Sequence, residues 1–451
     1  MERNLTSGSV FKSILFFSLP YLLSYFLQTL YGMADLLIIG QFDGVAGTTA
    51  VSVGSQVMHM LTVMIVGLAM GSTVSIGQSV GAGKKERTAA NIGNSITLFA
   101  VLSVLLMGIL LLFVKQIVHL MSTPQEAVTG TISYLTICFI GIPFIIAYNV
   151  ISSIFRGMGD SKSPMYFIAA ACVTNIALDY FFIGALQMGA AGAALGTTLS
   201  QAVSVIISLF MLRKQRDKIS LGKSDLKPRR QVITQLLKIG IPISLQDGFI
   251  QIAFIVITII ANRRGLNDAA AVGIVEKIIG FVFLVPSSLL STVSALGALN
   301  IGAGKQERAV LTLRYAAMTA VGFGLIVSVL MQFIAAPVVG LFTSDANVIF
   351  SGAQYLRGYI WDCLFAGIHF SFSGYFCACQ RSELSFIHNI ISILLVRIPG
   401  VYLTSKLFPD NLFPMGLATC LGSVLSVIIC VIAFILLSKR RSARETEIPI
   451  A

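Results

Sequence analysis

Twelve long apolar stretches divide this chain of 451 residues, and they constrain its fold more than any other feature. An α-helix needs about 20 residues to cross a hydrocarbon core of about 30 Å, and each stretch reaches that length. Only 11% of the residues are charged, whereas a typical soluble domain has about 25%. The sequence therefore predicts an all-α membrane protein. The expected spans are 12–39, 51–76, 90–115, 131–155, 165–184, 190–212, 233–260, 269–297, 310–336, 350–377, 385–408 and 413–438.

The basic residues predict how these spans are oriented. One set of connections, which includes both termini, carries 24 of the 31 Lys and Arg residues, and the opposite set carries four. Basic loops remain in the cytoplasm, so we expect a multi-pass protein of the cytoplasmic (inner) membrane with both termini inside. The same rule accounts for the net charge of +12 without nucleic acid. The longest polar stretch, 213–230, is an expected cytoplasmic linker that could contact anionic lipid.

The two halves of the sequence repeat each other at an offset of 221 or 222 residues. Residues 80–87 read VGAGKKER and residues 301–308 read IGAGKQER, while Pro20 and Pro242 are 222 apart. Six spans in each half make the repeat parallel, with a pseudo-twofold axis along the membrane normal. The prediction is two six-helix bundles around a cavity that opens to either side as the bundles rock. The N-lobe is expected over 1–222 and the C-lobe over 223–451.

Acidic residues inside the apolar stretches are candidates for function, because a charge in hydrocarbon is costly. They are Asp35, Asp179, Asp247, Glu276 and Asp362. A structural salt bridge is the alternative for each of them. It is favoured for Glu276, which adjoins Lys277, and for Asp362, which follows Arg357 closely.

Asp35 and Asp179 stand apart, because the interiors of the expected spans of the first half contain no Lys or Arg. Asn175 precedes Asp179 by four residues and Tyr31 precedes Asp35 by four, so each pair shares a helix face. Two carboxylates with an amide and hydroxyls form a set of oxygen ligands suited to a cation or a shared proton. Pro20 predicts a kink in the span that carries Asp35, and that kink is either static or a moving part.

Nothing in the sequence indicates an enzyme, a metal centre or a nucleotide site. The seven cysteines and four histidines show no shared metal-ligand spacing. The glycine-rich segment 80–87 does not match the phosphate-loop pattern. We therefore expect no catalytic residue, no resident cofactor and no structural metal, and an ion gradient as the driving force.

With these features the chain resembles the multidrug and toxic compound extrusion (MATE) transporters over nearly its whole length. It is most similar to the small bacterial branch that exports cationic dyes and antiseptics. The matching pieces are the first span with Pro20 and Asp35, QSVGAG at 78–83, RGMGDSK at 156–162, Asn175 to Asp179, GAALGT at 192–197, Val285-Pro286 and RIPG at 397–400.

The resemblance implies a V-shaped pair of bundles that exports drugs by antiport against a cation. The residues that match the family's N-lobe cation site are Asp35, Asn175, Asp179 and Thr197. The coupling ion is H⁺ or Na⁺, and the substrates are amphipathic, often cationic, drugs or toxic compounds. The functional unit is a monomer in contact with membrane lipid. Expected cavity residues are Tyr31, Asn149 and Ser152, which stands where Asn is common, and Gln246, Asp247, Gln251 and Glu276.

Two other functions stay open at this point. A lipid-linked saccharide flippase of the related superfamily would need a basic cavity for the pyrophosphate. Only Lys277, Arg357 and Arg397 lie away from the ends of the spans, all in the second half. A receptor or channel without coupled transport is disfavoured by a duplicated chain with buried carboxylates.

Overall fold

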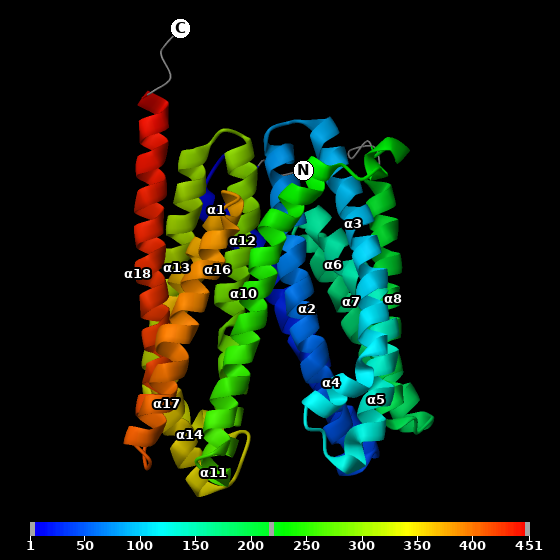
Figure 1. Ribbon diagram of the computed structural model, residues 1–451, viewed down its shortest axis with the longest axis vertical. Coiled ribbons are helices and arrows are strands. Elements are labelled where there is room, and N and C mark those ends of the chain that lie inside the picture. Colours follow the sequence, from blue (N-terminus) through cyan, green and yellow to red (C-terminus); the bar gives the residue numbers. More distant parts are fainter. Residues whose placement is uncertain (1–4, 216–220, 447–451) are drawn as a thin grey trace. The chain divides into compact units, whose positions relative to one another are not determined.

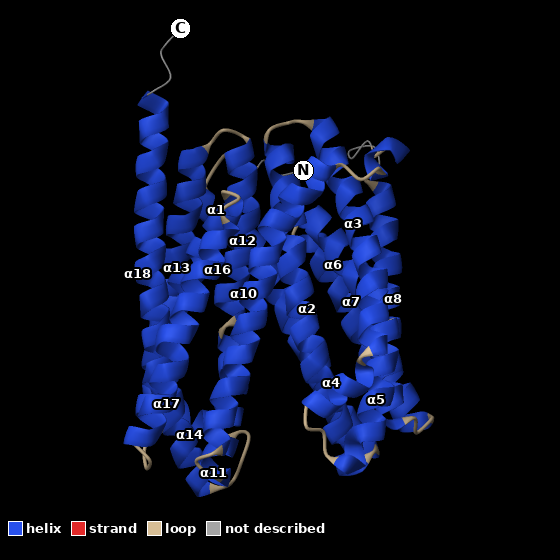
Figure 2. Cartoon of the chain, in the orientation of Figure 1, coloured by secondary structure: helices blue, strands red, loops and turns tan. Residues whose placement is uncertain are grey.

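The computed structural model describes residues 5–215 and 221–446, and within them the chain forms helices and no strands (Figure 2). Arg3, the linker residues 216–220 and the tail 447–451 lie outside the described residues. In the first half the helices are α1 (Val10–Phe42), α2 (Gly44–Gly81), α3 (Lys85–Leu112), α4 (Val114–Leu120), α5 (Gln125–Ile140), α6 (Ile142–Gly157), α7 (Lys162–Asp179), η1 (Tyr180–Ala185) and α8 (Gly189–Lys214).

After the linker the chain continues through a short helix and the second set of long helices (Figure 1). They are η2 (Lys223–Leu226), α10 (Arg230–Asn262), α11 (Leu266–Val282), α12 (Leu284–Gly302), α13 (Gln306–Gly340), α14 (Ala346–Tyr359), α15 (Asp362–Ala378), α16 (Ser382–Ser392), η3 (Ile393–Arg397), α17 (Ile398–Leu407) and α18 (Phe413–Thr446).

All twelve predicted stretches coincide with helices, although several are broken. Ten helices of the described residues are long and apolar enough to cross a membrane, and the count is eleven if the pair α5 and α6, bent by 47°, is one span. The remaining stretch, 350–377, contains α14 and α15, which are separated by Ile360 and Trp361. Large apolar side chains such as Leu37, Leu105 and Phe333 are exposed on the helices, as expected of surfaces that face lipid. The chain is a multi-pass membrane protein.

The backbone confirms the internal repeat. Six of the ten described residues with a positive φ form three pairs separated by 221 residues, because turns recur at equivalent positions of the two halves. The pairs are Gly44 and Gly265, Gly83 and Gly304, and Gly159 and Gln380. Pro20 and Pro242 likewise lie inside the corresponding long helices α1 and α10.

Packing divides the chain into two compact units, and the division differs from that of the repeat. Unit 1 comprises 1–244 and 298–306, and unit 2 comprises 245–297 and 307–451. Unit 1 thus holds the first half together with the beginning of α10 and the end of α12. The lobe boundary at residue 222 describes the repeat and stays a prediction.

Glycine contacts explain why these two pieces belong to unit 1. A Cβ added at Gly71 in α2 would overlap the backbone of Leu236 in α10. A Cβ at Gly81 would overlap the Leu299 carbonyl in α12, and one at Gly302 would overlap the Gln78 carbonyl in α2. The last two contacts are related by the 221-residue repeat, so α2 and α12 cross at equivalent points.

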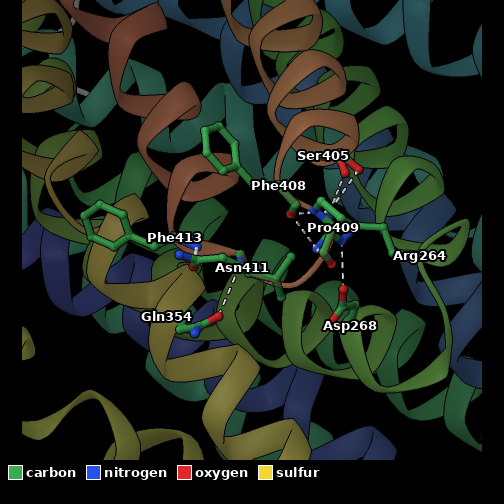
Figure 3. Close-up of polar contacts among 9 residues, drawn as sticks. Arg264, Asp268, Gln354, Ser405, Phe408, Pro409, Asn411 and Phe413 are labelled. Carbon is green, nitrogen blue, oxygen red and sulfur yellow. Dashed lines mark hydrogen bonds and ion pairs between the residues drawn. The ribbon is translucent and has the colours of Figure 1, made fainter.

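Unit 2 has its own polar clamp at the turn between α10 and α11 (Figure 3). The Arg264 guanidinium donates to Asp268 at 2.7 Å and to the carbonyls of Ser405 and Pro409 at 2.5 and 2.6 Å. This side chain therefore joins the α10–α11 turn to the segment between α17 and α18. Nearby, the Gln354 side chain accepts a hydrogen bond from the Leu412 amide.

Candidate functional site

Asp35 is buried in unit 1, where α1 meets α8. This residue is only 2% exposed. The Thr197 hydroxyl donates a hydrogen bond of 3.0 Å to Asp35 Oδ2. The other oxygen, Oδ1, is buried without a hydrogen-bond partner. The predicted pairing of these two residues in one cluster is therefore present in the fold.

Asn175 and Asp179 complete this cluster from α7. Both residues are fully buried, and both side chains approach Asp35 closely enough to interact with its carboxyl group. Neither forms a hydrogen bond of standard geometry: both Asp179 oxygens and both Asn175 polar atoms are without a partner. Asp179 is the last residue of α7, directly before the π-helical turn η1. Such turns are frequent at functional sites.

Gly196 is a site residue that the sequence reasoning missed. A Cβ at this position would overlap Asp179 Oδ1, so the carboxylate lies directly against the α8 backbone. Only glycine leaves room for the Asp179 carboxylate at this position. The next residue, Thr197, donates the hydrogen bond to Asp35. The GAALGT motif at 192–197 contained the signal, because its glycine adjoins the matched threonine.

The expected cavity residues of the first half differ in their relation to the cluster. Tyr31 is half-buried and lies near Asp35 and Gln201, the latter being another residue not singled out from sequence. Asn149 is buried and donates to the Ile145 carbonyl of its own helix at 2.8 Å. Ser152 is buried with an unpartnered hydroxyl. Their role as cavity residues stays a prediction.

Pro20 lies fifteen residues before Asp35 in α1, which continues through it as one helix. The Ser24 hydroxyl donates to the Pro20 carbonyl at 2.7 Å. The proline ring still removes one backbone hydrogen bond. Its role as a kink stays a prediction.

The cluster concentrates acceptor atoms without a matching positive charge. No Lys or Arg forms an ion pair with Asp35 or Asp179 in the parts of the chain that the structure describes. Among those residues, no three His, Cys, Asp or Glu side chains converge as metal ligands. The donor set is two carboxylates, one amide and one hydroxyl. Such a set can neutralise itself by binding a proton or a small hard cation.

The second-half candidates lie in unit 2. The Thr258 hydroxyl donates to Glu276 Oε2 at 3.1 Å, and Oε1 is buried without a partner. Gln246 is buried, and Asp247 and Gln251 are half-buried. The ion pair considered for Glu276 is not formed, because Lys277 points to the exposed side of α11. Successive residues on a helix face directions about 100° apart, so adjacency in sequence does not pair them.

Asp362 does form a salt bridge, but not with the residue nearest in sequence. Arg397 Nη2 lies 2.6 Å from Asp362 Oδ2 and 3.1 Å from the Tyr359 hydroxyl. Arg357 instead donates to the Gln332 carbonyl at 3.0 Å. The break between α14 and α15 separates Arg357 from Asp362, which corrects the sequence expectation.

Arg156 is a buried base of the first half that the sequence placed in a loop. It lies in the last turn of α6 and is only 8% exposed. Its guanidinium stacks 4.3 Å from the centre of the Tyr21 ring, a cation–π contact. Unit 1 therefore buries a positive charge of its own, although outside the acidic cluster.

Comparison with known proteins identifies the family of the chain. The MatE family model matches residues 20–181 and 242–403, one copy for each half. The chain is 29% identical over 400 residues to the probable multidrug resistance protein YpnP of Bacillus subtilis (strain 168), with 89% of each chain covered. It is 26% identical over 402 residues to the multidrug export protein MepA of Staphylococcus aureus (strain MSSA476), with 88% of each covered.

Solved structures share the fold. One described as MATE in the straight conformation superposes with a TM-score of 0.89, at 24% identity over 98% of both chains. A superfamily transporter from Pyrococcus furiosus, whose binding pocket is described as reversed in polarity, also superposes with a TM-score of 0.89, at 24% identity over 97% of both chains. At these identities the likeness concerns the fold alone.

Proposed function

The chain belongs to the MatE family, and on that premise we propose that it is an antiporter driven by H⁺ or Na⁺. It exports amphipathic, often cationic, drugs or toxic compounds across the cytoplasmic membrane by alternating access. The names of two relatives, a multidrug resistance protein and a multidrug export protein, support export as the direction of transport.

One observation carries the proposal of ion coupling. Asp35, held by Thr197, lies with Asp179 and Asn175 in a buried cluster that has no basic partner among the described residues. Two buried carboxylates cannot both stay charged at low cost. A proton or Na⁺ relieves this cost, and so does a cationic substrate near the same acids. Ion and substrate therefore compete, which is the thermodynamic requirement for exchange.

The internal repeat supports alternating access. A parallel duplication supplies two bundles of the same construction that can rock against each other about a shared axis. The rocking motion would be centred on the equivalent contacts at Gly81 and Gly302. There α2 and α12 pack closely because neither glycine has a side chain. This family of proteins transports solutes, and we propose no catalytic chemistry, cofactor or nucleic-acid partner for the chain.

The experiment uses the full chain in vesicles loaded with a fluorescent cationic dye, with Na⁺ and pH gradients imposed separately. One of the two gradients is expected to drive dye transport. Asp35→Asn and Asp179→Asn should each abolish the response at normal expression. Glu126→Gln, an acid in the first turn of α5 outside the cluster, is the matched control. Transport that proceeds equally without either gradient, or with both cluster acids neutralised, would overturn the mechanism.

The flippase alternative gains no support from the second half. Arg397 is neutralised by Asp362, so it is not a free cation for a pyrophosphate. Binding of a lipid-linked saccharide by the purified protein, with no dye exchange, would revive that alternative.

A further inference from the structure

A basic cleft lies in unit 1 where the beginning of α3 meets the beginning of α10. It has a volume of about 770 Å³. Its lining includes three arginines, Arg87, Arg229 and Arg230, and a single acid, Glu86. No residue of the expected ion-coupling cluster lines it. The cleft is therefore a separate feature of the molecule.

The arginines of the cleft are incompletely neutralised. Arg229 forms an ion pair of 3.4 Å with Asp225, and Arg87 donates to the Gln235 side chain, also at 3.4 Å. Arg230 makes no side-chain ion pair or hydrogen bond within the described ranges. Even with Glu86 and Asp225 counted, the cleft keeps a positive charge.

The wall of the cleft is fixed by contacts between the linker and α3. Asn94 accepts a hydrogen bond of 2.6 Å from the Arg229 amide and donates to the Asp225 carbonyl at 3.1 Å. The Thr97 hydroxyl donates to the Leu226 carbonyl at 2.8 Å. These bonds hold η2 against α3 and place the arginines before any ligand binds, which lowers the entropy cost of binding.

The cleft also lies at the border between polar and apolar sequence. In α3 the basic residues end at Arg87 and a long apolar run follows. Its first eight residues, 88–95, are buried, and its exposed large apolar side chains begin at Val101. In α10 the apolar run begins at Val232, itself part of the lining. The phosphates of a bilayer lie at this border, on the side that the basic loops assign to the cytoplasm.

We propose that this cleft binds the phosphate headgroup of one anionic phospholipid from the cytoplasmic leaflet. Arginine suits the ligand because its planar guanidinium donates two parallel hydrogen bonds to phosphate oxygens. The acyl chains would extend along α3 toward its exposed apolar side chains Val101, Val104 and Leu105, with which a free phosphate ion would make no contact. The inference is independent of which compound the protein transports.

The repeat makes the proposal specific, because it predicts one site and not two. Arg87 has an equivalent in Arg308, 221 residues later. At the 222-residue offset that relates Pro20 to Pro242, the positions equivalent to Arg229 and Arg230 are Ser7 and Gly8, which carry no charge. Only in the second half, where the linker leads into α10, do two further arginines, Arg229 and Arg230, lie at the start of the helix.

The test is native mass spectrometry of the purified full chain in neutral detergent, titrated with phosphatidylglycerol, phosphatidylcholine or inorganic phosphate. One phosphatidylglycerol per chain is expected to bind more tightly than phosphatidylcholine. The combined change Arg87→Ala, Arg229→Ala and Arg230→Ala should weaken that binding about tenfold or more. Should the triple variant fold poorly, Arg230→Ala alone should weaken binding several-fold, since that side chain supports no internal bond.

The matched control is Lys12→Ala, Arg213→Ala and Lys214→Ala, which removes the same charge from other exposed positions of unit 1. Its affinity should stay within about twofold of the unchanged protein, because the Debye length of about 8 Å limits the effect of distant charges. Equal losses in both triple variants would overturn the site in favour of general surface charge. Tight binding of inorganic phosphate that displaces the lipid would identify an ion site and overturn the lipid assignment.

Discussion

Arg397 forms an ion pair of 2.6 Å with Asp362, although 35 residues separate them in sequence. The pair is buried in unit 2, and the Tyr359 hydroxyl also contacts the guanidinium. In unit 1, Asp35 is surrounded by an acid, an amide and a hydroxyl instead. The repeated halves therefore share a scaffold, but Asp362 of the second half has a buried basic partner, whereas Asp35 and Asp179 have none among the described residues.

The Arg397–Asp362 pair predicts a non-additive stability effect. Arg397→Met leaves Asp362 buried without a partner and should destabilise the protein by about 3–5 kcal/mol. The double variant Arg397→Met with Asp362→Asn should recover part of that loss, because no charge stays buried alone. Thermal unfolding of the purified protein measures both. A double variant less stable than the single one would contradict this assignment.

Thr197 should affect the affinity for the coupling ion through its hydrogen bond to Asp35. Thr197→Val removes a bond to a carboxylate worth about 1.5–3 kcal/mol, and about a tenfold change in the apparent affinity for the driving ion is expected. Thr197→Ser keeps the hydroxyl and should restore most of the affinity. Thr198→Val is the neighbouring control, since that hydroxyl bonds only the Ile137 carbonyl. Dye exchange at graded ion concentrations gives the readout, and equal effects at both positions would exclude a specific role.

Gly196 should be intolerant of even one methyl group. Gly196→Ala would force the Asp179 carboxylate away from α8, so ion-driven dye exchange should fall strongly while expression persists. Gly32→Ala, in α1, meets no atom within 4 Å and should leave exchange intact. Exchange that survives in Gly196→Ala with unchanged ion dependence would show that the position of Asp179 is not critical.

The crossing of α2 and α12 should depend on its two glycines. Gly81→Leu and Gly302→Leu each place a side chain against a backbone carbonyl and should cost about 1–3 kcal/mol through overpacking. Because the contacts are related by the repeat, the two losses should be similar in size. Gly322→Leu in α13, where a Cβ meets nothing within 4 Å, is the control. Melting temperatures equal to that of the control would show that the crossing can yield without cost.

Local sequence was enough to predict much of the fold. The helices, their lengths and the duplication follow from apolar stretches and from a repeat that recurs in the turns, as Gly83 and Gly304 illustrate. Asp35 and Asp179 could be selected because a carboxylate in an apolar stretch is unusual wherever the helix packs. These features depend on neighbouring residues or on a constant offset, and both can be read along a chain.

Partners across the fold could be decided only by the tertiary structure. Sequence proximity suggested Arg357 for Asp362, whereas the helix break and the packing of η3 select Arg397. The space that Gly196 leaves for Asp179 and the cleft that joins Arg87 to Arg230 likewise involve residues from different helices. The sequence by itself determined which groups are buried in a membrane and that the chain is duplicated. Which of those groups meet was decided by packing, because contact energies depend on distances that chain order does not specify.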